Sequence, residues 1–292
     1  MKTVHWIWIE MSPYKILFKV YYIGQKKYFG SQRQLDFLTI EQCLLNALKK
    51  KKYIHKIGNS NFEFASRTDR HVSARGACFT CVIEKIPILM EINSELPKEI
   101  GIWAHAEVPM DFSSRHNAIL RHYVYFVPTP ISYFKEPFAL NIDIMEQACK
   151  ELKGRHDFSN FSKKEPNEIN TIRDMDSIRL TIKNDYLIFH FKSKSFLRQQ
   201  IRRMVKKILE LGKNEISYDD FLNLFDTSAD ISYQPADPKG LILWDIKFDE
   251  TVNFKEDLKS RERMKNYFLI KEIAYNLKYN LFRTLQQDDF SQ

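Results

Sequence analysis

The order of strand-like and helix-like segments repeats once along the chain, and this repeat constrains the fold more than any other feature of the sequence. In the first half, residue periodicity predicts a strand, a helix and three strands, at 14–22, 40–52, 61–66, 75–86 and 100–107. In the second half it predicts a strand, a helix, a hairpin, two helices and a strand, at 123–127, 143–152, 175–182 with 187–192, 197–211, 218–225 and 241–248. The shared order predicts an α+β fold made of two similar, closely packed halves.

Four segments follow from this pattern: an N-terminal extension (1–13), a first half (14–122), a second half (123–250) and a terminal helix (251–292). We expect residues 1–10 to be dispensable, because their apolar stretch is too short for a signal sequence and the first clear strand starts only afterwards. The terminal helix carries spaced apolar residues that either cap its own domain or meet a second copy of the chain. These are Leu258, Phe268, Ile273, Leu277, Leu281 and Leu285.

Composition excludes several classes of protein. The eight glycines are all isolated, so the clustered glycines of dinucleotide-binding and phosphate-binding loops are absent, and we expect no nucleotide cofactor. Cys78 and Cys81 have the spacing of zinc ligands, but no second pair follows, so we expect buried reduced thiols, no metal site and a cytoplasmic protein. No apolar run is long enough to span a membrane. The net charge of +8 fits either a basic soluble protein or a partner that is a polyanion, and the placement of the charges must decide.

The first candidate site is the loop at 66–74, which follows a predicted strand directly. Asp69 lies there between Arg67 and Arg70. The two guanidinium groups favour the ionised carboxylate, which can serve as a nucleophile or as a positioned base. A loop-capping Asp paired with a surface arginine is the alternative interpretation.

A second candidate lies on the predicted helix at 197–211. Arg198, Arg202 and Lys206 recur every four residues beside an apolar stripe, and no acidic residue appears before Glu210. A solvated helix face usually mixes both signs of charge. We therefore expect this basic row to line a groove that binds an anion, phosphate in the first place.

The third candidate is Tyr123 in the predicted strand at 123–127, directly after Arg121 and His122. Aromatic residues in strands are usually part of the core, but a tyrosine beside basic residues can also stack on an unpaired base. The sequence patterns of zinc and serine hydrolases are absent.

In sequence order, these segments resemble the tRNA pseudouridine synthase A family over about residues 14–249. The blocks that carry the resemblance are Arg67-Thr68-Asp69, Leu96-Pro97 with Ile102-Trp103-Ala104, 107–112, 118–125, 154–158 with Phe161, Thr171-Ile172-Arg173, Ser195-Phe196-Leu197 with Arg202, and Pro235-Ala236 with Gly240-Leu241. Each block alone is weak, but their common order makes chance agreement improbable.

The resemblance implies a fold, a reaction and a set of roles. The fold is the pseudouridine synthase fold, in which two halves share a continuous, mainly antiparallel sheet with flanking helices and a central cleft. Asp69 would be the aspartate that attacks or activates C1′ of a uridine, so that the freed uracil turns and rejoins the ribose through carbon 5. Tyr123 would stack on the target base, Arg202 would pair with Asp69, and Arg67 would fill the space that the flipped base leaves.

The family resemblance also implies partners. The substrate would be tRNA, at uridines 38–40 of the anticodon stem-loop, the enzyme would be a homodimer, and the isomerisation would need no cofactor. Arg70, Arg198 and Lys206 are our candidates for contacts with the RNA backbone.

Departures from the family pattern lie around Asp69. Arg70-His71 stands where the pattern has Ala-Gly, Ser73 replaces a histidine, and the segment Gly30-Ser31-Gln32 lacks a tryptophan. Glycine adopts positive φ freely, whereas histidine does so at some cost. A non-catalytic paralogue that binds or chaperones RNA is therefore the alternative function, and a basic protein with no RNA role is a third.

Overall fold

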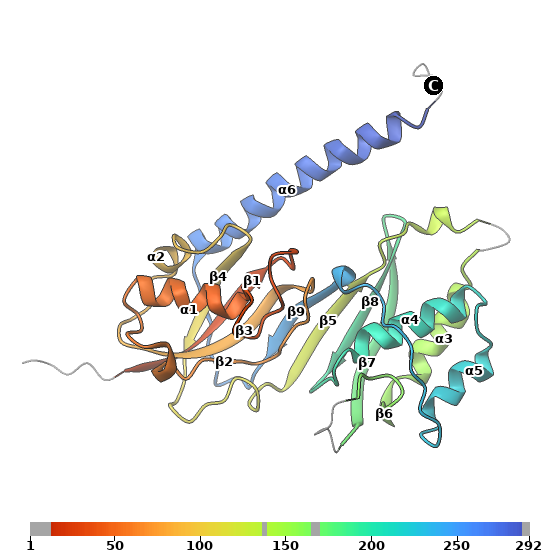
Figure 1. Cartoon of the computed structure of the whole chain (residues 1–292), viewed down its shortest axis with the longest axis horizontal. Coiled ribbons are helices and arrows are strands. Elements are labelled where there is room, and N and C mark those ends of the chain that lie inside the picture. The colour runs from red at the N-terminus through yellow and green to blue at the C-terminus, as the bar shows by residue number, and fades with distance from the viewer. Residues whose placement is uncertain (1–12, 136–138, 165–169, 288–292) are drawn as a thin grey trace, which may run out of the picture.

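The computed structural model describes residues 13–135, 139–164 and 170–287, so nearly all of the predicted N-terminal extension lies outside the described residues (Figure 1). Six α-helices occur in this part of the chain: α1 (Ile40–Lys50), α2 (Leu89–Asn93), α3 (Ile142–Glu151), α4 (Gln200–Gly212), α5 (Tyr218–Leu222) and α6 (Leu258–Thr284). The strands are β1 (Tyr14–Tyr22), β2 (Glu63–Phe64), β3 (Ser73–Ile83), β4 (Ile100–Glu107), β5 (Leu120–Phe126), β6 (Gly154–Asp157), β7 (Ile172–Lys183), β8 (Tyr186–Ser193), β9 (Leu241–Lys247) and β10 (Lys255–Glu256).

All ten strands belong to one sheet. Nine follow the order β10-β4-β1-β3-β9-β5-β8-β7-β6, and β2 pairs with β3 beside this path. Every pair is antiparallel except β3 with β9, which is parallel and joins the two halves at Ser73↔Ile242 and Ala74↔Leu243. The predicted α+β fold with a continuous, mainly antiparallel sheet is therefore confirmed.

Alternation along the strands decides which face of the sheet each helix covers. Tyr22 belongs to the main core, together with residues of α1 and α4, whereas the preceding Tyr21 packs with Trp103 and Met264 in a second cluster. Consecutive side chains of a strand point to opposite faces. The main helices therefore cover one face of the sheet, and the start of α6 covers the other face at β1 and β4.

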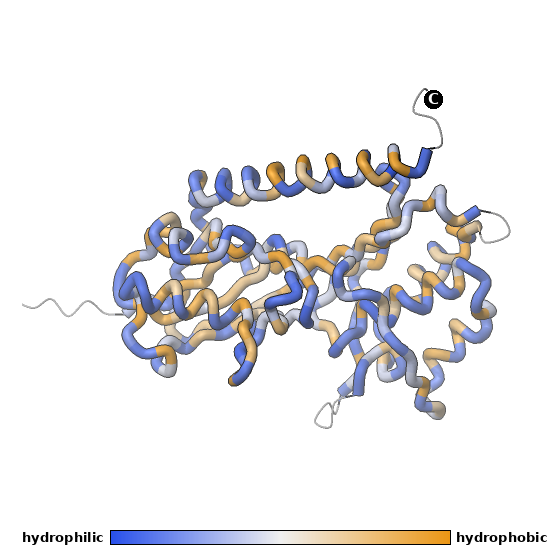
Figure 2. Tube along the Cα trace, turned by 45° about the horizontal axis from the view of Figure 1, so that its top comes forward, coloured by the Kyte–Doolittle hydropathy of each residue, from blue (hydrophilic) through white to orange (hydrophobic). Residues whose placement is uncertain are grey.

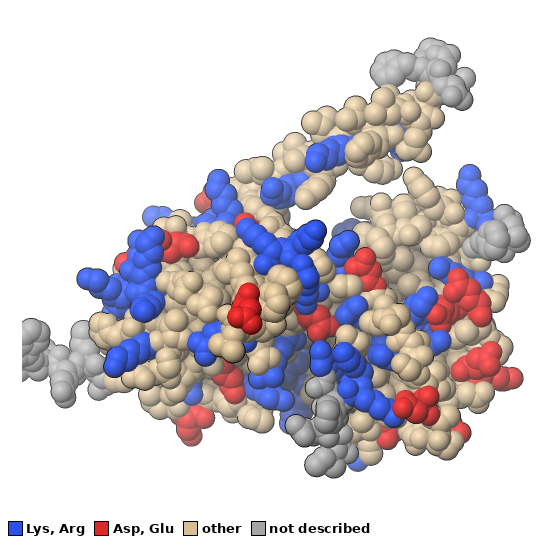
Figure 3. Space-filling view, viewed as in Figure 1, with Lys and Arg blue, Asp and Glu red and all other residues tan. Residues whose placement is uncertain are grey.

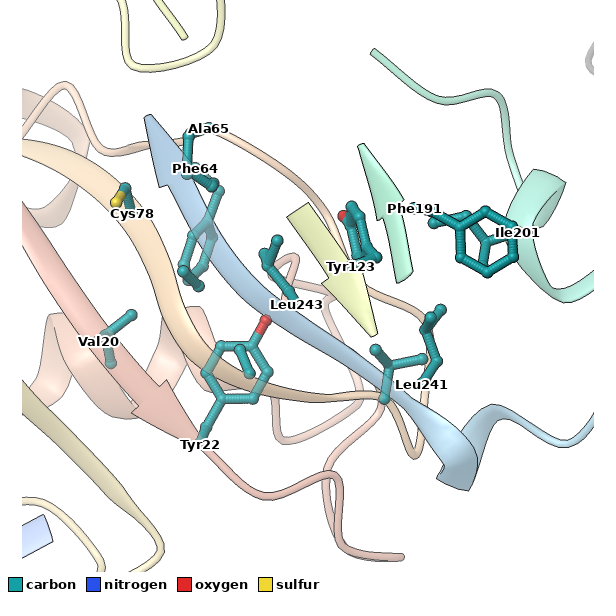
Figure 4. Close-up of a cluster of buried hydrophobic side chains, with 14 of the residues drawn as sticks. Val20, Tyr22, Phe64, Ala65, Cys78, Tyr123, Phe191, Ile201, Leu241 and Leu243 are labelled. Carbon is teal, nitrogen blue, oxygen red and sulfur yellow. The ribbon is translucent and has the colours of Figure 1, made fainter. Parts of the chain in front are cut away.

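The main core runs without a break through the junction between the halves. Figure 4 shows Val20 and Tyr22 of β1, Leu243 of β9 and Tyr123 of β5 side by side, with Ile201 of α4 farther along. Cys78 and Cys81, which have zinc-ligand spacing, are buried free thiols, as expected. The shared core makes one rigid base for any site that lies between the halves.

Several element boundaries differ from those predicted. The helix predicted at 197–211 begins at Gln200, because Gln199 adopts a left-handed conformation (φ 59°) and turns the chain into the helix. Spacing to Glu146 predicts Asp143 as the cap of α3, but Asn141 caps it and accepts a hydrogen bond from the Ile144 amide. The predicted hairpin turn is confirmed, with positive φ at both Asn184 and Asp185.

Among the residues that the structure describes, helix α6 packs on the body through its first turns. Ser260 and Met264 are buried, and Arg263 donates a hydrogen bond to the Tyr21 hydroxyl at 2.7 Å. Every residue from 269 to 283 is exposed. The helix thus extends beyond the body (Figure 1), with hydrophobic residues along its length (Figure 2), and the part beyond its first turns does not cap its own domain. No helix in the described part of the chain is long and apolar enough to cross a membrane.

The register of β9 at the junction predicts that substitutions of two neighbouring residues, Leu243 and Trp244, have very different effects on stability. Leu243 is fully buried, whereas Trp244 is 40% exposed on the opposite face. We expect Leu243→Ala to lower the free energy of unfolding by about 2–5 kcal/mol, since it leaves a cavity between the halves. The matched variant Trp244→Ala should cost about 1 kcal/mol or less in urea denaturation. Equal losses in the two variants would contradict the described register.

Candidate functional site

A pocket of about 900 Å³ opens where the two halves meet, and Asp69 is part of its wall. Its lining comes from loops near β1, from the 62–72 segment, from β5 and from the start of α4. Figure 3 shows Lys and Arg side chains around the hollow between the halves. The site is thus built across the junction, and neither half contains it alone.

Hydrogen bonds to the neighbouring loop fix the backbone of the Asp69 loop (residues 66–72). The Thr68 amide donates to the Ser31 hydroxyl at 2.8 Å, and the Ser31 amide donates to the Thr68 carbonyl at 3.1 Å. The hydroxyls of Tyr22 and Thr68 lie 2.8 Å apart. Asp69 therefore starts from a backbone held on both sides by β1 and the loop that follows it.

His71 occupies a left-handed position, with φ 71°. This is the conformation that the glycine of the family pattern adopts freely, and histidine pays about 1 kcal/mol for it. Gly24 makes room for it, because a Cβ at Gly24 would lie 2.2 Å from the His71 carbonyl carbon. The Ser73 hydroxyl accepts a hydrogen bond from the Gly24 amide at 3.1 Å. The turn is therefore kept despite the departures from the family pattern, and it is stabilised by the space at Gly24 and by the hydrogen bond from Gly24 to Ser73.

Asp69 forms an ion pair with Arg202 of α4, as predicted. Arg202 Nη1 lies 2.9 Å from Asp69 Oδ2, and the arginine side chain is 10% exposed, against 36% for the carboxylate. Arg202 Nε donates to the Ala236 carbonyl at 2.8 Å, while the Ala236 amide donates to the Arg202 carbonyl at 3.0 Å. The Ala236 carbonyl thus holds the Arg202 guanidinium in place independently of Asp69. Because Arg202 contacts Oδ2, the other oxygen of the partly exposed Asp69 carboxylate is available to react.

Tyr123 lies in the wall of the same pocket. It is 7% exposed, and its ring meets Phe196 edge to face at 5.2 Å. Burial raises the pKa of its phenol. The preceding His122 points to the other face of β5, where its Nε2 lies 3.3 Å from Nδ1 of His190. Burial, with nearby Lys192 and His190, lowers the pKa of His122 to about 4. His122 is therefore outside the site.

The other predicted residues divide into two groups. Arg67, Arg70 and Arg198 line the pocket, and the side chains of Arg67 and Arg198 are exposed. Lys206 is outside the lining and pairs with Glu210 at 3.0 Å. The predicted basic row of the helix is thus broken, because Arg198 precedes α4 and only Arg202 lies both on the helix and in the pocket.

Arg121 is a residue of the site to which the sequence assigned no role. It is 7% exposed, and its guanidinium donates to the Ser66 hydroxyl and to the carbonyls of Ala65, Arg115 and Lys194. It therefore ties the start of the Asp69 loop to the segment before α4. The one feature of the sequence that pointed to Arg121 was its position two residues before Tyr123 in a predicted strand. That position does not reveal that the side chain donates to four acceptors in distant segments.

The basic residues that line the pocket are arginines and not lysines. Among the described residues, eight of the chain's fifteen arginines line it, and none of the thirty lysines does: Arg33, Arg67, Arg70, Arg115, Arg121, Arg173, Arg198 and Arg202. Three carboxylates, from Glu41, Glu63 and Asp69, share the lining. Arginine presents a planar fork that binds phosphate through two hydrogen bonds and stacks on aromatic rings. The charge of the site therefore fits the phosphates and bases of a nucleic acid.

Metal binding has no evident place in this arrangement. In the described ranges, no group of three or more His, Cys, Asp or Glu residues lies close enough to hold an ion. Of the three carboxylates in the lining, Asp69 is the one held by the buried guanidinium of Arg202, in the same pocket as the ring of Tyr123.

Comparison with known proteins agrees with this geometry. Residues 148–249 match the model of a family described as tRNA pseudouridine synthase. Among curated proteins, the chain is similar to the tRNA pseudouridine synthase A of Methanothermobacter thermautotrophicus, with 33% identity over 83% of this chain and 84% of the relative. The corresponding protein of Pyrococcus furiosus is 34% identical over 83% and 86%, and that of Archaeoglobus fulgidus 32% over 95% and 99%.

Arg121 yields a test of how the Asp69 loop is held. We expect Arg121→Met to lower the free energy of unfolding by about 2–4 kcal/mol, because the buried carbonyl of Ala65 and the partly buried carbonyls of Arg115 and Lys194 lose their donor. The matched control is Arg115→Met, which removes an exposed side chain and keeps the backbone carbonyl, and should change stability by about 0.5 kcal/mol or less. Urea denaturation measures both. A loss below 1 kcal/mol for Arg121→Met would contradict the bracing role.

Proposed function

Because this chain belongs to the tRNA pseudouridine synthase A family, and is therefore a tRNA-modifying isomerase, we propose that it acts on uridines 38–40 of the anticodon stem-loop with Asp69 as the nucleophile. The observation that carries this proposal is the contact between Asp69 and the buried Arg202 in a pocket lined by arginines. An ionised, oriented carboxylate with an open oxygen is what attack on a sugar carbon requires.

The proposed reaction moves one proton and one glycosidic bond. A carboxylate oxygen of Asp69 bonds to C1′ of the ribose while the bond from C1′ to N1 breaks, and uracil leaves as its anion. The uracil turns, C5 bonds to C1′, and the Asp69 carboxylate is released. The proton of C5 is lost and N1 is protonated, so that substrate and product are isomers. Arg202 orients the Asp69 carboxylate at the start and stabilises its release at the end.

Tyr123 supplies the face on which the uracil turns. Its phenol is neutral at pH 7 already at the ordinary tyrosine pKa of about 10, and burial raises that pKa further. A neutral buried phenol favours stacking on the base over removal of the C5 proton. The nearby ring of Phe196 supports Tyr123 from the side and keeps its orientation.

The rim of the pocket carries the contacts with RNA in this proposal. A uridine must leave its stack to reach Asp69, at a cost of a few kcal/mol that is lowest in loops and at weak pairs. Arg67, which is exposed and lines the pocket, fills in this proposal the gap that the flipped base leaves. Arg70 and Arg198 contact the backbone, and Lys206 contacts RNA only beyond the pocket.

The proposed active form is a homodimer in which α6 makes contact with the second copy. Nine large apolar side chains near its end are 49–71% exposed: Leu269, Ile270, Ile273, Tyr275, Leu277, Tyr279, Leu281, Phe282 and Leu285. In proteins, most of the stability of a helix comes from packing of its apolar face and not from its intrinsic helix propensity. Apolar surface on several sides of a helix is typical of helices that are buried in an assembly.

The location that we propose is the cytoplasm. All four cysteines, Cys43, Cys78, Cys81 and Cys149, are free thiols, as a reducing compartment would leave them.

The proposed nucleophile predicts a loss of turnover without a loss of binding. We expect Asp69→Asn to reduce tritium release from tRNA labelled at uridine C5 by at least about 10³-fold, since an amide cannot form the ester. The affinity for tRNA and the unfolding midpoint should change little. Asp245→Asn removes the same charge from a pair with Lys19 outside the pocket, and should keep full turnover.

Two other outcomes would change the assigned nucleophile or the assigned function. Equal release from the wild type and from Asp69→Asn would show that another group is the nucleophile. No release from either protein, with salt-dependent binding of tRNA intact, would favour the non-catalytic RNA-binding paralogue.

Helix α6 predicts the oligomeric state. We expect the wild type to be a dimer at micromolar concentration and the double variant Leu277→Lys with Leu281→Lys to be a monomer, as measured by light scattering after gel filtration. Both residues are exposed and lie beyond the contact of α6 with the body, so the unfolding midpoint of the body should not change. Lys278→Ala on the same segment is the control and should stay dimeric. A monomeric wild type would refute this interface.

A further inference from the structure

Three side chains form a stack at the rim of the pocket. The guanidinium carbon of Arg70 lies 3.9 Å from the centre of the Phe29 ring, and the rings of Phe29 and Phe37 are stacked with their centres 4.1 Å apart. Arg70 Nη2 also donates to the Lys26 carbonyl at 2.9 Å. The stack is therefore fixed at the end where it meets the Asp69 loop.

The other end of the stack is open. Phe37 is 45% exposed, and within the described residues its ring makes contact with no aromatic ring other than Phe29. It lies on the rim loop (residues 32–38), in which Gln32, Arg33 and Gln34 line the pocket and Leu35 is fully exposed. An exposed ring backed by two further planar groups is an unused aromatic platform beside an arginine-lined pocket.

We propose that this stack binds an unpaired base of the substrate RNA, a nucleotide that flanks the target uridine, on the free face of Phe37. The proposal rests on the proposed function, because it places a second base beside the one that reaches Asp69. Bases of single-stranded RNA stack on exposed aromatic rings, with a gain that tolerates any sequence because every base has a flat face. Phe29 and Arg70 hold Phe37 in place, so the platform is ordered before the RNA arrives.

Arg70 links this platform to the reacting group. It follows Asp69 directly and stands where the family pattern has alanine, so the stack is a feature of this chain. Its guanidinium adds positive charge at the end of the stack beside the pocket, and lysine could not replace it because an ammonium group lacks the planar face. The expected role is specificity: the platform selects tRNAs with an unstacked neighbour at the target and leaves the chemical step unchanged.

The test uses anticodon stem-loops in which 2-aminopurine replaces, one position at a time, each nucleotide that flanks the target. Its fluorescence falls when it stacks on an aromatic ring. We expect quenching at one flanking position with the wild type, loss of this quenching with Phe37→Ala, and its retention with Phe37→Trp. For tritium release, KM should rise about 5- to 100-fold in Phe37→Ala with kcat within about twofold, since one stacked base is lost.

The matched control is Leu35→Ala, which removes a more exposed apolar side chain from the same loop but leaves the stack intact. It should keep both the quenching and the KM. Equal effects in Leu35→Ala and Phe37→Ala would overturn the proposal and indicate a general apolar contact of the loop. A lower kcat at constant KM in Phe37→Ala, with an unchanged unfolding midpoint, would also overturn it, because the ring would then act on the reaction itself.

Failure of the proposed function would look different. If Asp69→Asn kept its turnover while Phe37→Ala lost quenching, the assignment of the nucleophile would fall and the platform would stand. If Asp69→Asn lost turnover and no flanking position was quenched in the wild type, the platform would fall and the nucleophile would stand.

Discussion

The contact between Asp69 and Arg202 is the interaction on which the site depends, because its two members come from different halves of the sheet. Asp69 lies just before β3 and Arg202 on α4, and they meet only because β3 and β9 pair in parallel at the junction. Burying the guanidinium of Arg202 beside a partly exposed carboxylate costs desolvation free energy, which further hydrogen bonds must offset. The Ala236 carbonyl supplies one of them, so the segment before β9 takes part in positioning the pair.

Arginine and lysine have separate uses in this protein. Lysines outnumber arginines two to one in the sequence, yet the pocket takes arginines only, among the residues that the structure describes. Arg202 orients the reacting carboxylate, Arg121 braces the loop beneath it, and Arg70 ends a stack of rings at the rim. Each role needs a planar group with several fixed donors, which an ammonium group does not have. The net charge of the chain alone did not reveal this division.

Substitutions around Asp69 are coupled through space. Ser31, Ser73 and His71 all depart from the family pattern or occupy departing segments, and the structure brings them together between the loop after β1 and the Asp69 loop. The turn at His71 survives a residue that tolerates positive φ poorly, because Gly24 leaves space for its carbonyl and Ser73 holds the Gly24 amide. These changes brace the Asp69 loop and leave the Asp69–Arg202 contact in place.

The sequence by itself determined eight of the ten strands and five of the six α-helices of the described chain, because side-chain alternation and apolar stripes report burial locally, but it predicted neither the short strands β6 and β10 nor the helix α2. Its motif pattern placed Asp69, Tyr123 and Arg202 in one site. It did not determine which donors and acceptors meet across the junction, so Arg121 had no assigned role and Lys206 was grouped with residues that line the pocket. It also left open whether the apolar residues of the terminal helix cap their own domain or meet a second copy of the chain. Only the tertiary structure decided which groups meet across the junction, and only it showed that the apolar residues of α6 beyond its first turns do not pack on the body. These points depend on the parallel pairing of β3 with β9 and on the direction in which α6 leaves the body, and neither is encoded in local periodicity.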